Sequence, residues 1–221
     1  EAATKVKMGP EKHRLQSEKD RELTAYHEAG HAIVAWSLPQ MDPVHRVSIV
    51  ARGMALGFTM IPPTHDRYNE TKSRLMEQIT ALLGGRAAEE LVFKEFSAGA
   101  GSDIAQATGI ARRMVTEFGM SELGPIYFPE GTGRGWLSPM FGEEAGSSEA
   151  LAAKVDEQMM KLIDGCYLRA QEVLARRREK LDLVAKALVE KETLEGDEFL
   201  KLLAAGPVVT PPAPDTKPNI S

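Results

Sequence analysis

The chain has 221 residues, of which 43% are hydrophobic, so it is long enough for one sizeable domain with a buried core. Its 27 Lys and Arg against 32 Asp and Glu give a formal net charge of −5, which argues against a nucleic-acid partner. A single cysteine, Cys166, excludes an intrachain disulfide, and no apolar stretch approaches the roughly 20 residues that a membrane-spanning helix needs.

The first third of the chain predicts a linker, one helix and two short strands. Residues 1–20 are polar and highly charged, and we interpret them as a linker from an upstream module. A helix should begin near Thr24 and end before Pro39, with apolar residues spaced along one side. Alternating β-branched residues predict a strand at 44–50, and a second short strand is predicted at 55–61.

The remainder of the chain is mainly helical in pattern. Thr71 is the predicted N-cap for the first helix of this part, and the paired Gly84 and Gly85 within it indicate that another backbone comes close there. The Gly-rich stretch 129–147 is interpreted as a mobile loop, and the proline-rich residues 206–221 as a disordered tail. The predicted helices span 72–93, 103–119, 148–178, 178–191 and 197–204.

One motif carries chemistry: His27-Glu28-Ala29-Gly30-His31 has the form H-E-x-x-H on the first predicted helix. The spacing of four residues puts both imidazoles on one face, one turn apart, where they can bind a zinc ion. Glu28 follows the first ligand and is not itself bound, so it can take a proton from a metal-activated water. We therefore predict a catalytic zinc with Glu28 as the general base.

Two surface histidines could match this pattern by chance, because only three positions are fixed. The apolar side of the same helix and the short β element that follows it favour a functional site. Zincins hold the substrate backbone on an edge strand beside this helix, by backbone pairing. The candidates for that contact are Leu56, Gly57, Phe58 and Thr59.

A catalytic zinc needs a third protein ligand and one open position. The metzincin continuation requires Gly at position 34 and His at position 37, where this chain has Val34 and Ser37. Other residues must supply the ligand, and each has an ordinary alternative role as a helix-capping acid, an ion-pair partner or a loop histidine. The candidates are Asp103, Glu89, Glu90, His45 and His65.

Between the two strongest candidates, we favour Asp103 over Glu89. Asp103 follows the small residues 98–101, which let the backbone come near a metal, and a helix N-terminus would favour its ionised form. Glu89 lies inside a helix beside a second acid and an arginine, a setting that also suits a buried ion pair. An indirect role, in which it bonds to a ligand histidine, remains for Glu89.

Five strings in order resemble the FtsH family of membrane-anchored, ATP-dependent zinc proteases: 23–32, 42–47, 55–57, 83–90 and 99–104. The resemblance covers about residues 8–205, with Ser102 where the family usually has Asn. It implies a mainly α fold, a helical zinc-peptidase domain with a small β element beside the H-E-x-x-H helix. It also implies one zinc per chain, held by His27, His31 and Asp103, with Glu28 as the catalytic base.

The resemblance further implies a setting. Residues 21–205 would be the zinc metallopeptidase domain, and residues 1–20 the linker from a missing ATPase module, which alone would bind ATP. No G-x-x-x-x-G-K-[ST] pattern occurs in this chain. The family assembles as a homohexamer. Its parent proteins lie in the bacterial inner membrane with this domain on the cytoplasmic side, so membrane contact would come only through missing N-terminal segments and this fragment would be soluble.

The function predicted from these patterns is endopeptidase cleavage of unfolded or membrane-extracted polypeptides. One alternative is a zinc-stabilised helical assembly module without catalysis of its own. A purely structural zinc site needs no base at Glu28 and usually fills all four metal positions with protein ligands, so the motif disfavours this alternative. A second alternative, a peptidase of another zincin clan, would show a metzincin-like third histidine.

Overall fold

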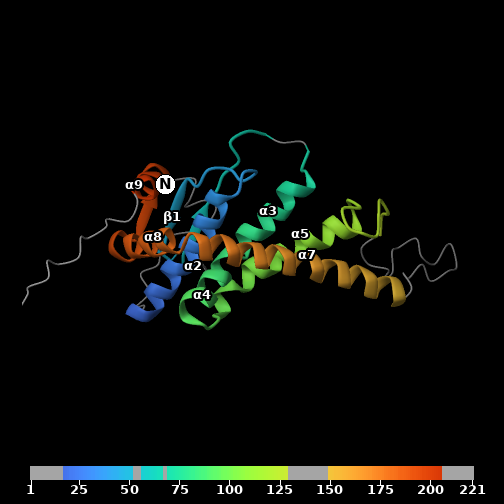
Figure 1. Cartoon of the computed structure of the whole chain (residues 1–221), viewed down its shortest axis with the longest axis horizontal. Coiled ribbons are helices and arrows are strands. Elements are labelled where there is room, and N and C mark those ends of the chain that lie inside the picture. The colour runs from blue at the N-terminus through green and yellow to red at the C-terminus, as the bar shows by residue number, and fades with distance from the viewer. Residues whose placement is uncertain (1–16, 52–55, 67–68, 129–148, 206–221) are drawn as a thin grey trace, which may run out of the picture.

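The computed structural model describes residues 17–51, 56–66, 69–128 and 149–205. Within these ranges, helices carry most of the chain and three short strands form one small sheet (Figure 1), which confirms the mainly α prediction. The predicted loop at 129–147 and tail at 206–221 lie outside the described residues. The helices are α2 (Glu18–Ser37), α3 (Lys72–Leu82), α4 (Gly84–Phe93), α5 (Gly101–Thr116), α7 (Glu149–Arg176), α8 (Arg178–Lys191) and α9 (Gly196–Ala205), with the 3-10 turn η1 (Ala98–Ala100) before α5.

The motif helix α2 begins at Glu18, within the stretch predicted as a linker, and the predicted start at Thr24 is wrong. Ser17 is the N-cap, because its hydroxyl oxygen accepts a hydrogen bond from the Asp20 backbone N–H at 3.1 Å. Thr24 lies inside the helix, where its hydroxyl donates to the Asp20 carbonyl at 2.8 Å. Because the residues from Thr24 to Ala35 are all buried, α2 is the central helix of the molecule.

The single helix predicted at 72–93 is in fact two helices, α3 and α4, which break at Leu83. The Thr71 cap is confirmed, since its side chain accepts from the Arg74 backbone N–H. The backbones of α2 and α4 touch: a Cβ at Gly30 would lie 2.5 Å from the Gly84 carbonyl oxygen. The paired glycines therefore allow a close helix crossing, as the sequence indicates.

The sheet is antiparallel, and its order is β2-β1-β3. β1 (Arg46–Ser48) and β2 (Phe58–Met60) are shorter than the strands predicted at 44–50 and 55–61. β3 (Thr193–Glu195) is not predicted by the sequence pattern, and it pairs with β1 from far along the chain. β2 therefore lies at one edge of the sheet, next to α2.

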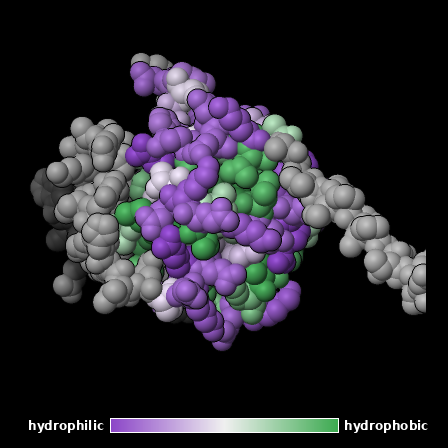
Figure 2. Space-filling model, turned by 90° about the vertical axis from the view of Figure 1, so that its left-hand side faces the viewer, coloured by the Kyte–Doolittle hydropathy of each residue, from purple (hydrophilic) through white to green (hydrophobic). Residues whose placement is uncertain are grey.

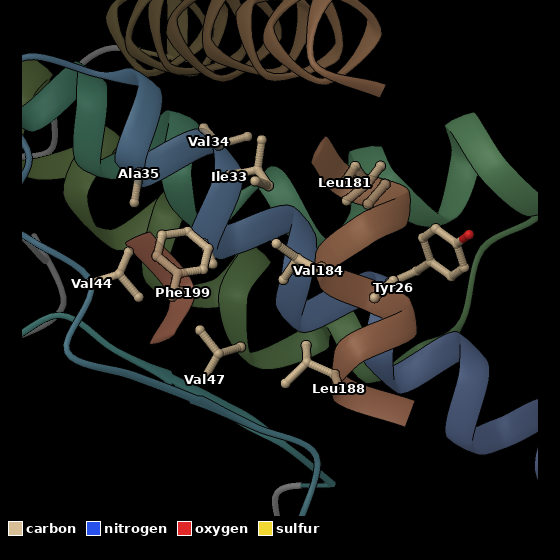
Figure 3. Close-up of a cluster of buried hydrophobic side chains, with 14 of the residues drawn as sticks. Tyr26, Ile33, Val34, Ala35, Val44, Val47, Leu181, Val184, Leu188 and Phe199 are labelled. Atoms are coloured by element: carbon tan, nitrogen blue, oxygen red, sulfur yellow. The ribbon is translucent and has the colours of Figure 1, made fainter. Parts of the chain in front are cut away.

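The main core lies between α2, α8, α9 and the sheet. In Figure 3, Ile33 of α2 and Val184 of α8 point toward the same interior as Val47 of β1 and Phe199 of α9, and each of these side chains is buried. A second cluster joins α3, α5 and α7, and α7 runs along the length of the molecule (Figure 1). The main core includes buried residues of both α2 and α4, and this packing fixes the motif helix.

The outer surface is mainly polar where Figure 2 displays it. That view faces the end of the molecule that holds α8 and α9, and it shows hydrophobic patches separated by hydrophilic residues. Among the helices of the described ranges, none combines the length and the apolar character needed to cross a membrane.

Candidate metal centre

The structure brings His27, His31 and Asp103 together. Each offers one ligand atom, and the three atoms lie within 4.8 Å of one another. The two Nε2 atoms are 3.0 Å apart, and Asp103 Oδ2 is 3.3 Å from Nε2 of His27 and 3.5 Å from Nε2 of His31. Both histidines come from successive turns of α2, while Asp103 comes from the first turn of α5.

The orientation of both imidazoles follows from what their Nδ1 atoms contact. Nδ1 of His27 lies 2.6 Å from Glu89 Oε1, and Nδ1 of His31 lies 2.8 Å from the Ala81 carbonyl oxygen. A carboxylate and a carbonyl oxygen accept hydrogen bonds, so we assign the proton of each neutral ring to Nδ1. Each Nε2 then presents its lone pair to the cluster, which is the state that a metal ligand requires.

Electrostatics also favour a cation among these three groups. Burial alone would lower the pKa of His27, but its hydrogen bonds to Asp103 and Glu89 outweigh burial and raise the pKa to about 10. Burial would raise the pKa of Asp103, yet its hydrogen bonds with the two histidines outweigh that effect and lower this pKa well below its usual range. A metal cation could replace a proton held by these converging acceptors. Two imidazoles and one carboxylate form a donor set suited to zinc.

Gly85 of α4 leaves the space beside the two imidazoles open. A Cβ at this position would lie 2.6 Å from Nε2 of His27 and 2.6 Å from Nε2 of His31, closer than real Cβ atoms approach other heavy atoms. Any side chain at position 85 would therefore press on both ligand atoms. The donor set and this clearance together fit a bound metal ion.

Glu28 lies beside the cluster but is not one of its three members. It is only 6% exposed, and burial raises the pKa of its carboxyl group. Thr59 of β2 donates its hydroxyl to Glu28 Oε2 at 2.8 Å, and Gly57 lies against the other carboxylate oxygen. A buried carboxylate beside a metal centre can accept and return a proton.

Glu89 contacts the His27 ring and is itself held by Ser97. Besides His27, two groups of Ser97 contact it: the backbone N–H donates to Oε2 at 2.7 Å and the hydroxyl donates to Oε1 at 2.9 Å. Burial would raise the pKa of Glu89, but the hydrogen bonds from His27 and Ser97 outweigh it and lower the pKa. Sequence reasoning missed Ser97, because one serine in a small-residue loop carries no signal of its own.

The other candidates for a third ligand lie elsewhere. Glu90 accepts a hydrogen bond from the Tyr167 hydroxyl at 2.6 Å, and neither His45 nor His65 belongs to the cluster of His27, His31 and Asp103. His45 donates its backbone N–H to the Met60 carbonyl oxygen beside the sheet, and the His65 ring contacts the Thr64 hydroxyl.

The four candidates for substrate contact fall at the start of β2. Phe58 and Thr59 lie in the strand, whereas Leu56 and Gly57 precede it. Phe58 is buried, Thr59 contacts Glu28, and Leu56 is 39% exposed.

The helical fold and this centre define a candidate metallopeptidase, and comparison with known proteins gives the family. The model of Peptidase family M41 matches residues 14–202. The chain is 50% identical over 204 residues to "ATP-dependent zinc metalloprotease FtsH 1" of Thermoanaerobacter sp., which covers 91% of this chain and 33% of that protein. It is 44% identical over 209 residues to "ATP-dependent zinc metalloprotease FtsH" of Bacillus subtilis, covering 93% of this chain and 33% of that protein.

The chain therefore belongs to Peptidase family M41, the metalloendopeptidase family of these FtsH proteins, and the predicted FtsH resemblance is confirmed. The chain spans about a third of the length of these relatives, since 33% of each is covered.

Proposed function

We propose that this chain is a zinc-dependent endopeptidase domain in which His27, His31 and Asp103 hold one zinc ion and Glu28 is the general base. The observation that carries the proposal is the convergence of three ligand atoms within 4.8 Å beside a buried carboxylate. Membership of Peptidase family M41 and the names of the relatives support both zinc and proteolysis.

When bound, zinc would supply the Lewis acid that polarises the scissile carbonyl and acidifies the attacking water. The chain's own residues do the rest. Glu28 accepts the proton of that water and returns it to the leaving amine. The Glu89 carboxylate accepts a hydrogen bond from the Nδ1–H of His27, which holds the ring so that its Nε2 keeps facing Asp103. Burial of the Glu28 carboxylate excludes water that would compete for its proton.

The substrate we propose is an extended segment of an unfolded or membrane-extracted polypeptide. β2 lies at the edge of the sheet beside α2, so a peptide could pair with its backbone and pass the metal centre. Leu56, Gly57, Phe58 and Thr59 are the residues we propose for this contact.

The base role is tested with Glu28→Gln. We expect the zinc-loaded variant to lose peptide cleavage while it keeps one zinc per chain, measured by a fluorogenic peptide assay and metal analysis. Glu77→Gln is the matched control, because Glu77 is 3% exposed on α3 and bonds to the Gln40 backbone, away from the cluster. Full activity in Glu28→Gln would exclude the general-base role. A wild-type chain that binds zinc but cuts no peptide would favour the assembly module without catalysis.

The ligand assignment is tested by zinc stoichiometry in Asp103→Ala and Glu89→Gln. We expect Asp103→Ala to lose most of its zinc, and Glu89→Gln to keep a stoichiometric but weaker site. If Asp103→Ala retains a full equivalent while Glu89→Gln loses it, the two roles are reversed.

We also propose the setting of the whole protein. Residues 21–205 would belong to its peptidase domain, and an ATPase module that alone binds ATP would come before this domain. The parent would be a homohexamer anchored in the bacterial inner membrane, with this domain on the cytoplasmic side. The words "ATP-dependent" in the names of the relatives, and the third of their length that this chain spans, support a longer protein. ATP-stimulated degradation of a folded substrate by this chain alone would contradict the proposal.

A further inference from the structure

We propose that Thr59 is a positioning residue that sets the orientation of the Glu28 carboxylate, so that the edge strand β2 holds the base as well as the substrate. The inference rests on the proposed function, because it concerns the residue to which that function assigns proton transfer. Its basis is a side-chain contact between two different elements, the strand β2 and the helix α2.

The first observation is the contact itself. The Thr59 hydroxyl lies 2.8 Å from Glu28 Oε2 and 3.1 Å from the Glu28 backbone carbonyl oxygen. A hydroxyl that donates to a charged carboxylate makes one of the stronger hydrogen bonds in a protein, and it favours one rotamer of the acid. Because threonine is β-branched, its own χ1 is restricted, so the direction of the hydroxyl is restricted as well.

The second observation is that the strand positioning Thr59 is itself fixed. Thr59 lies opposite Val47 of β1, and Val47 in turn lies opposite Leu194 of β3. Both Val47 and Leu194 are fully buried in the main core. The neighbour Phe58 points into the protein as well, at 7% exposure. The Thr59 hydroxyl is therefore presented by a strand that is anchored to the main core through its pairing with β1.

The third observation concerns the other oxygen of the same carboxylate. A Cβ at Gly57 would lie 2.8 Å from Glu28 Oε1 and 2.9 Å from Glu28 Cγ. It would also lie 2.8 Å from the Ser48 carbonyl oxygen, which belongs to the backbone of β1 and cannot easily move. Gly57 thus leaves room for one oxygen while Thr59 binds the other.

These contacts assign two tasks to one segment. Residues 57 and 59 are two apart, so they face the same side of an extended chain, the side that meets α2. A peptide that pairs with the edge strand β2 would lie on the same segment that orients the base. The alignment of substrate and base would then depend on a single short strand.

The kinetic test uses Thr59→Val, which keeps the shape of the side chain and removes the hydroxyl, and Thr59→Ser, which keeps the hydroxyl. In the zinc-loaded chain with a fluorogenic peptide, we expect Thr59→Val to lower kcat by about 10- to 100-fold with little change in KM. Thr59→Ser should recover most of kcat, and all variants should retain one zinc per chain. Thr193→Val is the matched control, because it removes a hydroxyl that bonds to Ser48 on the same sheet.

The second test needs no activity. In the metal-free chain, the urea midpoint is measured for Thr59→Val, Glu28→Ala and the double variant. If the two side chains interact, Thr59→Val shifts the midpoint less in the Glu28→Ala background than in the wild type. Equal shifts in both backgrounds would overturn the proposal. If Thr59→Val does not fold, Thr59→Ala takes its place in both tests and the same outcomes decide.

The outcomes separate this inference from the proposed function. If Glu28→Gln is inactive and Thr59→Val has wild-type kcat, the base role stands and the positioning role of Thr59 is wrong. If Glu28→Gln is fully active, the proposed base is wrong. If the wild-type chain cuts no peptide, the proposed function fails, and the urea midpoints still decide whether Thr59 and Glu28 are coupled.

Discussion

The two sides of helix α2 hold their functional groups in different ways. On one side, His27 and His31 face α3, α4 and α5, where helix backbones touch at Gly30 and Gly84 and leave little freedom. On the other side, Glu28 faces a strand of three residues at the edge of the sheet and is held by one hydroxyl. Damage to the first side should therefore cost metal or stability, whereas damage to the second should cost rate while zinc stays bound.

The largest effect is expected on the side of α2 that carries His27 and His31, which we call the ligand side, and the variant that tests it is Gly85→Ala. The new Cβ would lie 2.6 Å from both Nε2 atoms, so it would push the imidazoles apart or occupy the place of the ion. We expect zinc binding to be lost, and peptide cleavage with it, while the helical circular dichroism is retained. Metal analysis of the purified variant checks this.

Gly101→Ala is the control for that variant, since it lies at the start of the same helix as Asp103 and a Cβ there meets nothing within 4 Å. It should keep one zinc per chain. A Gly85→Ala variant with a full zinc equivalent would show that the clearance at this glycine is not needed.

The helix crossing itself is tested by Gly30→Ala. Its Cβ would lie 2.5 Å from the Gly84 carbonyl oxygen and 2.6 Å from the Ala88 Cβ, so α2 and α4 would have to separate. We expect the free energy of unfolding in urea to fall by about 1–3 kcal/mol. Gly109→Ala in α5 is the matched control, because a Cβ there meets nothing, and it should raise stability by about 0.5–1 kcal/mol.

A smaller effect on the ligand side is expected from Glu89→Gln. The amide oxygen can take the place of Oε1 and still accept from the His27 Nδ1–H and the Ser97 hydroxyl, but the side chain carries no charge. Its NH2 group then replaces Oε2 and faces the Ser97 backbone N–H, so that hydrogen bond is lost. Zinc affinity should fall by about 10- to 100-fold, measured by competition with a chelator. An unchanged affinity would mean that Glu89 does not support the ligand.

The smallest effect concerns the end of α4, away from both functional groups. Lys94 has the left-handed φ of 57°, which glycine adopts more easily. Lys94→Gly should raise the free energy of unfolding by about 0.5 kcal/mol, with zinc content and kcat unchanged. A loss of stability would mean that the lysine side chain has a packing role that outweighs its backbone strain.

Local geometry explains which parts of the site the sequence can predict. The H-E-x-x-H spacing alone puts His27 and His31 on one helix face, because residues four apart lie one turn apart. The small residues before Asp103 also predict that its backbone can come near a metal, and the structure places Asp103 beside the two histidines. The Ala81 carbonyl and the Ser97 hydroxyl are not predictable, because their residue types are common and only tertiary packing brings them to the histidine and the glutamate.

The fold shows the same limit. Long periodic segments predict α7, α8 and α9 well, since helical spacing is a repeated local signal. β3 has one buried apolar residue, Leu194, in three positions, and its pairing with β1 across the chain leaves no local pattern. The break at Leu83 has a local signal in the paired Gly84 and Gly85, but the apolar spacing continues across it, so the pattern predicts a single helix. The contact of Gly84 with α2 lies far away in sequence and leaves no local pattern.

The turn at Ser97 constrains the number of residues between Ser97 and Asp103 as well as the contact with Glu89. Ser97 binds Glu89 twice, and its hydroxyl oxygen also accepts a hydrogen bond from the Gly99 backbone N–H in η1, directly before the helix that carries Asp103. Each residue adds a rotation of about 100° in an α-helix and about 120° in a 3-10 helix. One residue inserted between positions 98 and 101 would therefore rotate Ser97 and Asp103 relative to each other, so the contacts of Ser97 with Glu89 and of Asp103 with the histidines would not both be kept. In the segment that joins Ser97 to α5, the number of residues is a stricter requirement than their identity.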